Sequence, residues 1–122
     1  MKQSSILNHP ILTSFSSKMQ ALYKDDLQRI ILFGSHARGE ATEESDIDLL
    51  ILLSKQEVNA YDEIPKITEE VFGLNIQYNQ VLFYLPMSIK RWQTEESFLL
   101  DNIRKDGVAI WERKWNSVRE AR

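Results

Sequence analysis

The run Leu49–Leu53 is the feature that most constrains how this 122-residue chain folds. All of its side chains are apolar, so both faces of an extended strand formed there must be shielded from water. A strand buried on both faces belongs inside a sheet that carries helices on each side. Because the chain is long enough to build one hydrophobic core, we predict a single domain over residues 1–122.

Three further β-prone runs are bounded by glycine or proline: Ile30–Phe33 before Gly34, Gln80–Leu85 before Pro86, and Val108–Trp111 after Gly107. Apolar residues that recur every three or four positions predict three helical regions: Pro10 to about Asp26, Pro65–Phe72 with Gly73 as its end, and Ser88–Ile103 with a break near 94–97. The alternation predicts an α/β or α+β fold, with a small mixed sheet of about four strands covered by helices.

Composition excludes several classes of protein. The chain has no cysteine, which rules out a thiol nucleophile, disulfides and cysteine-based metal sites. The first ten residues contain no long apolar run, so we expect neither a signal peptide nor a membrane partner, and a cytoplasmic location. The net charge is −3, and five carboxylates lie between positions 40 and 48, so extended nucleic-acid binding is not expected.

Two carboxylates stand at the start of the most apolar strand. Asp46 and Asp48 are two residues apart, so on an extended strand they point to the same face. Two such groups beside an apolar core repel each other, and a bound cation or a shared proton relieves the repulsion. Mg²⁺ suits the pair, since it takes one or two carboxylates and completes its shell with waters and phosphates. The alternative is that Asp46 is a turn residue and Asp48 pairs with an arginine, which is the more common explanation of an isolated D-x-D motif.

The residues after the first predicted strand suit a phosphate. Gly34 allows a sharp turn and a close approach of the backbone, and Ser35 adds a hydroxyl. If Ser35–Arg38 forms a helical turn, its first N–H groups favour an anion, and Arg38 adds a planar cationic fork. The alternative is a glycine hairpin with exposed polar side chains. A P-loop is excluded, because residues 40–41 lack the lysine and hydroxyl that it requires.

The continuous stretch from Phe33 to Leu50 resembles the signature of the DNA polymerase beta-like nucleotidyltransferase superfamily, and its minimal nucleotidyltransferase (MNT) branch most closely. The resemblance implies a nucleotidyltransferase-like fold. It also implies that Gly34 and Ser35 hold a nucleoside triphosphate, with Arg38 assisting, and that Asp46 and Asp48 are catalytic and bind magnesium.

One departure from the superfamily pattern concerns a third carboxylate, which a later strand usually supplies. Counting back from the proline that follows this strand, Gln80 occupies the expected position. Glutamine can coordinate a cation but cannot accept the proton of an attacking hydroxyl as a carboxylate can. Glu57, Asp62 and Glu63 are the alternative sources of a third carboxylate.

The resemblance implies a magnesium-dependent enzyme that transfers a nucleoside monophosphate, AMP from ATP, to a hydroxyl of a protein or another macromolecule. It further suggests the antitoxin side of a toxin–antitoxin pair, with a small helical HEPN-type protein as partner. The alternative hypothesis is a catalytically impaired nucleotidyltransferase-like module that neutralises or scaffolds a partner by binding, and the glutamine at position 80 supports it. A domain without any nucleotide function would leave the combined motifs unexplained.

Overall fold

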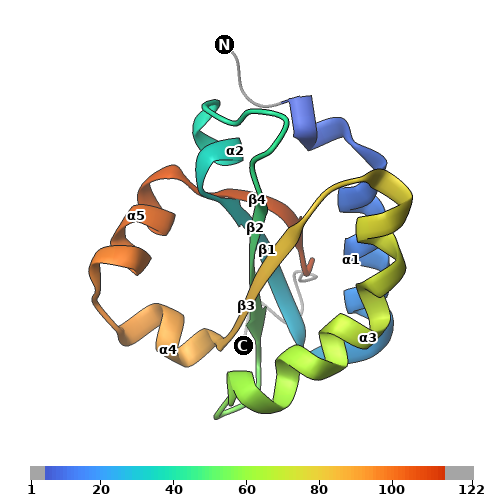
Figure 1. Ribbon diagram of the computed structural model, residues 1–122. Coiled ribbons are helices and arrows are strands. Elements are labelled where there is room, and N and C mark those ends of the chain that lie inside the picture. The colour runs from blue at the N-terminus through green and yellow to red at the C-terminus, as the bar shows by residue number, and fades with distance from the viewer. Residues whose placement is uncertain (1–4, 115–122) are drawn as a thin grey trace.

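The computed structural model describes residues 5–114 of the chain (Figure 1). Its helices are α1 (Pro10–Tyr23), α2 (Ser35–Arg38), α3 (Ala60–Tyr78), α4 (Ile89–Thr94) and α5 (Phe98–Asp106), with short 3₁₀ turns at Ser5–Asn8 and Lys24–Asp26. The strands are β1 (Leu27–Phe33), β2 (Ile47–Leu53), β3 (Leu82–Ser88) and β4 (Val108–Glu112). No helix within these described residues is long and apolar enough to cross a membrane.

The four strands form one mixed sheet in the order β3-β2-β1-β4. β1 pairs antiparallel with β2 and with β4, whereas β2 pairs parallel with β3. Helices α1 and α3 cover one face and α4 and α5 cover the other, so the sheet is the middle of three layers (Figure 1). The predicted small mixed sheet covered by helices is therefore confirmed.

Side chains alternate between the two faces and build a separate apolar cluster on each. Leu49, Ile51 and Leu53 of β2 pack beneath α1 and α3, whereas Leu50 and Leu52 pack beneath α4 and α5. All five of these residues are completely buried. The two-sided burial predicted for this run thus defines the centre of the molecule.

Helix α3 is longer at both ends than the predicted Pro65–Phe72. It begins after Asn59, whose side chain accepts a hydrogen bond from the Tyr61 N–H, so Pro65 lies inside the helix rather than in its first turn. Gly73 does not end the helix either. The buried Leu74 beyond it packs into the core, and this burial offsets the roughly 1 kcal/mol that an internal glycine costs.

Strand β3 also runs further than predicted. Pro86 lies within it and is the neighbour of Ile51 on β2. Because β3 is an outer strand of the sheet, a proline is tolerated where its missing N–H would face away from the sheet. The strand also begins at Leu82 rather than at Gln80, and this shift of two residues matters at the site described below.

An ionic cluster around the buried Glu63 of α3 joins this helix to α1. The Tyr23 hydroxyl donates to Glu63 Oε1 at 2.8 Å, and the ammonium groups of Lys55 and Lys66 lie 3.6 and 3.5 Å from Glu63 Oε2. Burial alone would raise the pKa of Glu63, but the hydroxyl and the two lysines together hold it below its ordinary value. The cluster therefore favours the charged carboxylate and helps to fix α3 against α1.

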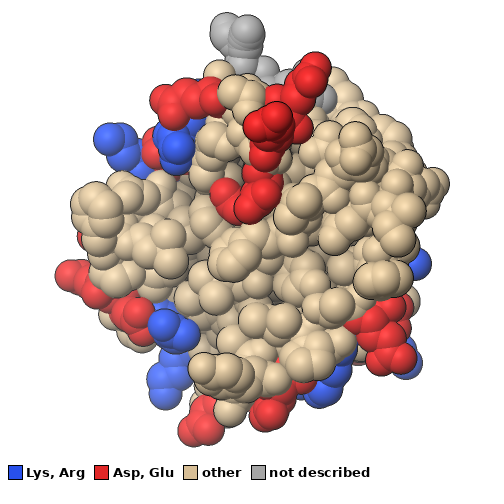
Figure 2. All heavy atoms as spheres, viewed as in Figure 1, with Lys and Arg blue, Asp and Glu red and all other residues tan. Residues whose placement is uncertain are grey.

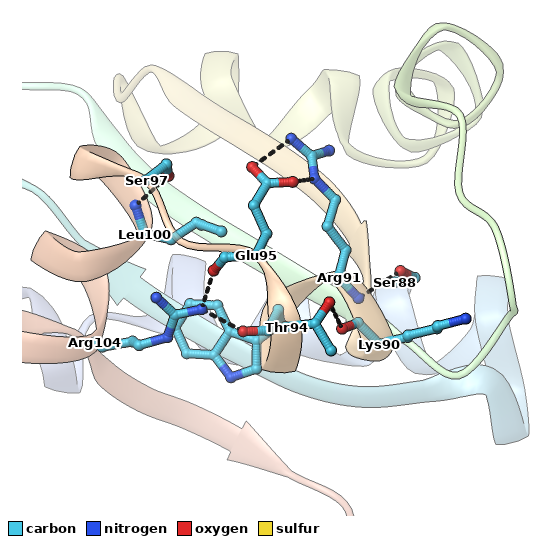
Figure 3. Close-up of polar contacts among 9 residues, drawn as sticks. Ser88, Lys90, Arg91, Thr94, Glu95, Ser97, Leu100 and Arg104 are labelled. Atoms are coloured by element: carbon cyan, nitrogen blue, oxygen red, sulfur yellow. Dashed lines mark hydrogen bonds and ion pairs between the residues drawn. The ribbon is translucent and has the colours of Figure 1, made fainter.

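The corner between α4 and α5 is held by Arg104 (Figure 3). Its guanidinium donates to the carbonyls of Trp92 and Glu95 and pairs with Asp101 at 3.1 Å. Its central carbon also lies 4.8 Å from the centre of the Trp92 ring. The predicted break near 94–97 is confirmed, and the corner seats α5 on the second face of the sheet.

Candidate active site

A tight turn follows β1 and leads into the four-residue helix α2. Gly34 adopts φ 76° and ψ −155°, a conformation that residues with a side chain rarely adopt. Its carbonyl accepts hydrogen bonds from the N–H groups of Ala37 and Arg38, so Ser35 begins a helical turn. The first N–H groups of such a turn have no acceptor within it, which suits an anion.

The side chain of Asp48 lies directly against this turn. A Cβ built on Gly34 would meet Asp48 Oδ2 at 2.1 Å and Cγ at 3.1 Å, so only a glycine leaves room for the carboxylate. Asp46 is exposed and comes immediately before β2, after a turn in which Ser45 Oγ accepts from the Thr42 N–H at 2.9 Å. The structure thus brings Gly34, Asp46 and Asp48 together at one end of the sheet.

Burial dominates the electrostatics of Asp48. Its neighbours on the adjacent strands are Phe33 of β1 and Phe83 of β3. Desolvation raises the pKa of Asp48, and the nearby Asp46 carboxylate raises it further, whereas His36 and Arg38 oppose the rise. The balance leaves a carboxylate whose negative charge is poorly compensated by the protein itself.

Two basic residues of α2 complete the surroundings. Arg38 is exposed, and its Nε donates to Glu40 Oε1 at 2.9 Å, so in this state the guanidinium is paired with the loop that follows. His36 is only 8% exposed, and its charge opposes the rise in the pKa of Asp48. The sequence pattern predicts no functional role for His36. Its position two residues after Gly34 is the one signal in the sequence that places it near the site.

Gln80 lies just before β3, at the same end of the sheet as the aspartates, but it is not the strand neighbour of Asp48. In the parallel pairing of β2 with β3, the residue opposite Asp48 is Phe83, whereas Gln80 precedes the strand. The alternative carboxylates lie elsewhere. Glu57, Asp62 and Glu63 follow the far end of β2, about 20 Å along the strand from its start, and Glu63 is held in the ionic cluster described above.

The donor set nevertheless suits Mg²⁺. Asp46 and Asp48 offer hard oxygen ligands, their mutual repulsion would be relieved by a cation, and the turn at Gly34 leaves the backbone open to a phosphate. Within residues 5–114, no group of three or more acidic, histidine or cysteine side chains is arranged to hold a metal. The two aspartates would therefore share a cation with water and substrate oxygens. Acidic side chains gather at the top of the face in Figure 2, at the end of the sheet where α2 lies in Figure 1.

Comparison with known proteins establishes the family. The profile of the nucleotidyltransferase domain matches residues 12–108. A protein of Methanocaldococcus jannaschii named "Putative protein adenylyltransferase MJ0141" is 33% identical over 100 residues, which span 82% of this chain and 95% of that protein. The chain therefore belongs to the nucleotidyltransferase domain family.

Solved structures show the same fold. A chain of a toxin–antitoxin complex with AMP-PNP aligns with a TM-score of 0.59 and 18% identity, covering 88% of this chain and 75% of that one. A chain of the complex between the tri-AMPylated Shewanella oneidensis HEPN toxin and its MNT antitoxin aligns with a TM-score of 0.50 and 15% identity, over 84% and 73% of the two chains. The mixed sheet with helices on both faces is thus a nucleotidyltransferase fold.

Proposed function

We propose that this nucleotidyltransferase transfers AMP from ATP to a hydroxyl group of a protein, with Mg²⁺ held by Asp46 and Asp48. The hydroxyl oxygen forms a bond to the α-phosphorus, the bond from that phosphorus to the β-phosphate oxygen breaks, and pyrophosphate and the hydroxyl proton leave. The observation that carries the proposal is the contact between the Asp48 carboxylate and Gly34, because it joins a cation-binding group to a phosphate-binding turn. The bound cation would align the phosphates and offset the charge that develops on them during transfer.

The residues around the cation would position the nucleotide. The N–H groups and hydroxyl at Ser35 would face the phosphates, and Arg38 would add a positive charge after leaving Glu40, with which it is paired in the structure. The acidic loop alone would repel a triphosphate, so we expect nucleotide binding to depend on the divalent cation.

We further propose that the acceptor is a small helical HEPN-type partner and that this chain acts as the antitoxin of the pair. The support is the AMPylated HEPN toxin in one structural neighbour and the adenylyltransferase name of the M. jannaschii relative. Fold-level likeness does not transfer a substrate, so the acceptor needs a direct test.

The test incubates the purified chain with ATP, Mg²⁺ and the product of the neighbouring gene, and weighs that product by mass spectrometry. We expect the mass of one or more AMP groups to be added, and none to be added by the double variant Asp46→Asn/Asp48→Asn. The matched control Glu43→Gln/Glu44→Gln removes two exposed charges from the same loop and should retain activity. Absence of AMP with the wild-type chain would refute this acceptor.

A second candidate function is neutralisation of the partner by binding alone. It is favoured by Phe83, because this residue places no proton acceptor beside Asp48. If the double aspartate variant neutralises the partner as well as the wild-type chain does, transfer is unnecessary and the binding function is correct. Loss of neutralisation together with loss of AMP transfer would instead support the enzyme.

A further inference from the structure

The Asp48 carboxylate stands between two phenylalanine side chains on the same face of the sheet. Phe33 of β1 and Phe83 of β3 are its partners on either side. The apolar clusters establish the face, since Leu85 and Met87 of β3 pack on the side of Leu50 and Leu52. Because side chains alternate along a strand, Phe83 shares that side with Asp48.

These two phenylalanine neighbours limit how many cations the site can hold. Two cations in a phosphoryl-transfer site lie roughly 4 Å apart and need oxygen ligands for each ion. A phenyl ring supplies none, and the carboxylates at this position are Asp46, immediately before β2, and Asp48, the second residue of β2. Among the described residues no third acidic, histidine or cysteine side chain joins them in a metal-binding group.

Phe83 also lies at the open side of the site. It is 50% exposed, and Val81, two residues earlier, is 57% exposed. Val81 precedes the outer strand β3 and Phe83 is its second residue, so among residues 5–114 no further strand lies beside them. Water or substrate can reach this position, where the exposed side chains of β3 and the residue before it, Phe83 and Val81, are apolar.

We propose that Phe83 restricts the site to one divalent cation, the one bound with the nucleotide by Asp46 and Asp48. This inference rests on the proposed function and specifies its metal stoichiometry. An attacking hydroxyl then meets no second cation and no carboxylate on β3, so that transfer, where it occurs, depends on the acceptor protein for further activation of the hydroxyl.

The experiment counts Mn²⁺ ions, which report by electron paramagnetic resonance, in the presence of a non-hydrolysable ATP analogue. Equilibrium dialysis should give one ion per wild-type chain and two per Phe83→Asp chain, with spin coupling between the ions in the variant only. Gln80→Asp is the matched control, because it adds the same charge before the strand, and it should still bind one ion.

Each outcome is decisive. Two coupled ions in the wild-type chain would overturn the one-cation inference while leaving the proposed function intact, whereas a chain that binds neither Mn²⁺ nor the nucleotide would refute both. A second ion in Gln80→Asp but not in Phe83→Asp would show that position 80, not 83, faces the site. Circular dichroism verifies folding of each variant, and the wild-type count tests the inference even if Phe83→Asp does not fold.

Discussion

Replacing Gly34 with alanine tests the contact on which the site depends. The backbone conformation of Gly34, φ 76° and ψ −155°, costs a residue with a side chain about 1–3 kcal/mol. The new Cβ would also lie 2.1 Å from Asp48 Oδ2, so the carboxylate or the turn must move, at a further cost of about 1–3 kcal/mol. We therefore expect Gly34→Ala to destabilise the chain by about 2–6 kcal/mol.

The two contributions can be separated with Asp48→Ala as the second change. Asp48→Ala removes the two atoms nearest to the new methyl group and leaves Asp48 Cβ at 3.4 Å, an ordinary contact distance. In this background Gly34→Ala should therefore retain the backbone cost and lose the steric cost. The two changes should couple by about 1–3 kcal/mol, which is the steric part alone.

Urea unfolding of the four chains at pH 7, followed by circular dichroism, measures this coupling. Binding of ATP in the presence of Mg²⁺, measured by calorimetry, should also be lost in Gly34→Ala. A coupling below about 0.5 kcal/mol would mean that the two substitutions act independently. The carboxylate of Asp48 would then not lie against the turn, and the proposed site would be wrong.

Three other predictions concern stability. Gly73→Ala should stabilise the chain by about 1 kcal/mol in urea unfolding, because the site is helical and nothing lies within 4 Å of the added methyl group; a loss of stability would contradict the length of α3. Tyr23→Phe should lower the free energy of unfolding by about 1.5–3 kcal/mol, since it removes a hydrogen bond to the Glu63 carboxylate. This loss should shrink as pH falls through the lowered pKa of Glu63, and a loss independent of pH would argue against the ionic cluster. Without Mg²⁺, Asp48→Asn should stabilise the chain at neutral pH. Because the pKa of Asp48 is raised in the folded state, the stability that its protonated form contributes is lost as pH rises through that pKa. The gain from Asp48→Asn should therefore disappear below the ordinary pKa of an aspartate, and a gain unchanged by pH would contradict the raised pKa.

The sequence was most informative where apolar pattern and glycine coincide. The run Leu49–Leu53 required cover on both faces, and the clusters beneath the two helical layers provide it. After the strand that stops at Gly34, the sequence left a helical turn over Ser35–Arg38 and a glycine hairpin as alternatives, and the structure shows the helical turn. Both features depend on residues close together in the chain, so local physical reasoning could find them.

Helix boundaries could not be predicted so well, because distant contacts decide them. Pro65 and Gly73 usually mark helix ends, yet α3 passes through both. Its length is set by the Asn59 cap and by burial of Val71 and Leu74 against the first apolar cluster. Tertiary packing outweighs local preferences of about 1 kcal/mol at a glycine, and no periodicity in a single sequence reveals it.

The identity of the residue beside Asp48 depends on the same kind of non-local information. Counting back from Pro86 as the end of its strand gives Gln80, but Pro86 is accommodated inside β3, which is an outer strand of the sheet that the described residues form. In the observed register of β3 against β2, the residue opposite Asp48 is Phe83 rather than Gln80. A polar side chain beside Asp48 would supply an oxygen ligand for a second cation, whereas the phenyl ring of Phe83 supplies none. The register of the outer strand β3 therefore determines whether the site offers ligands for one cation or for two.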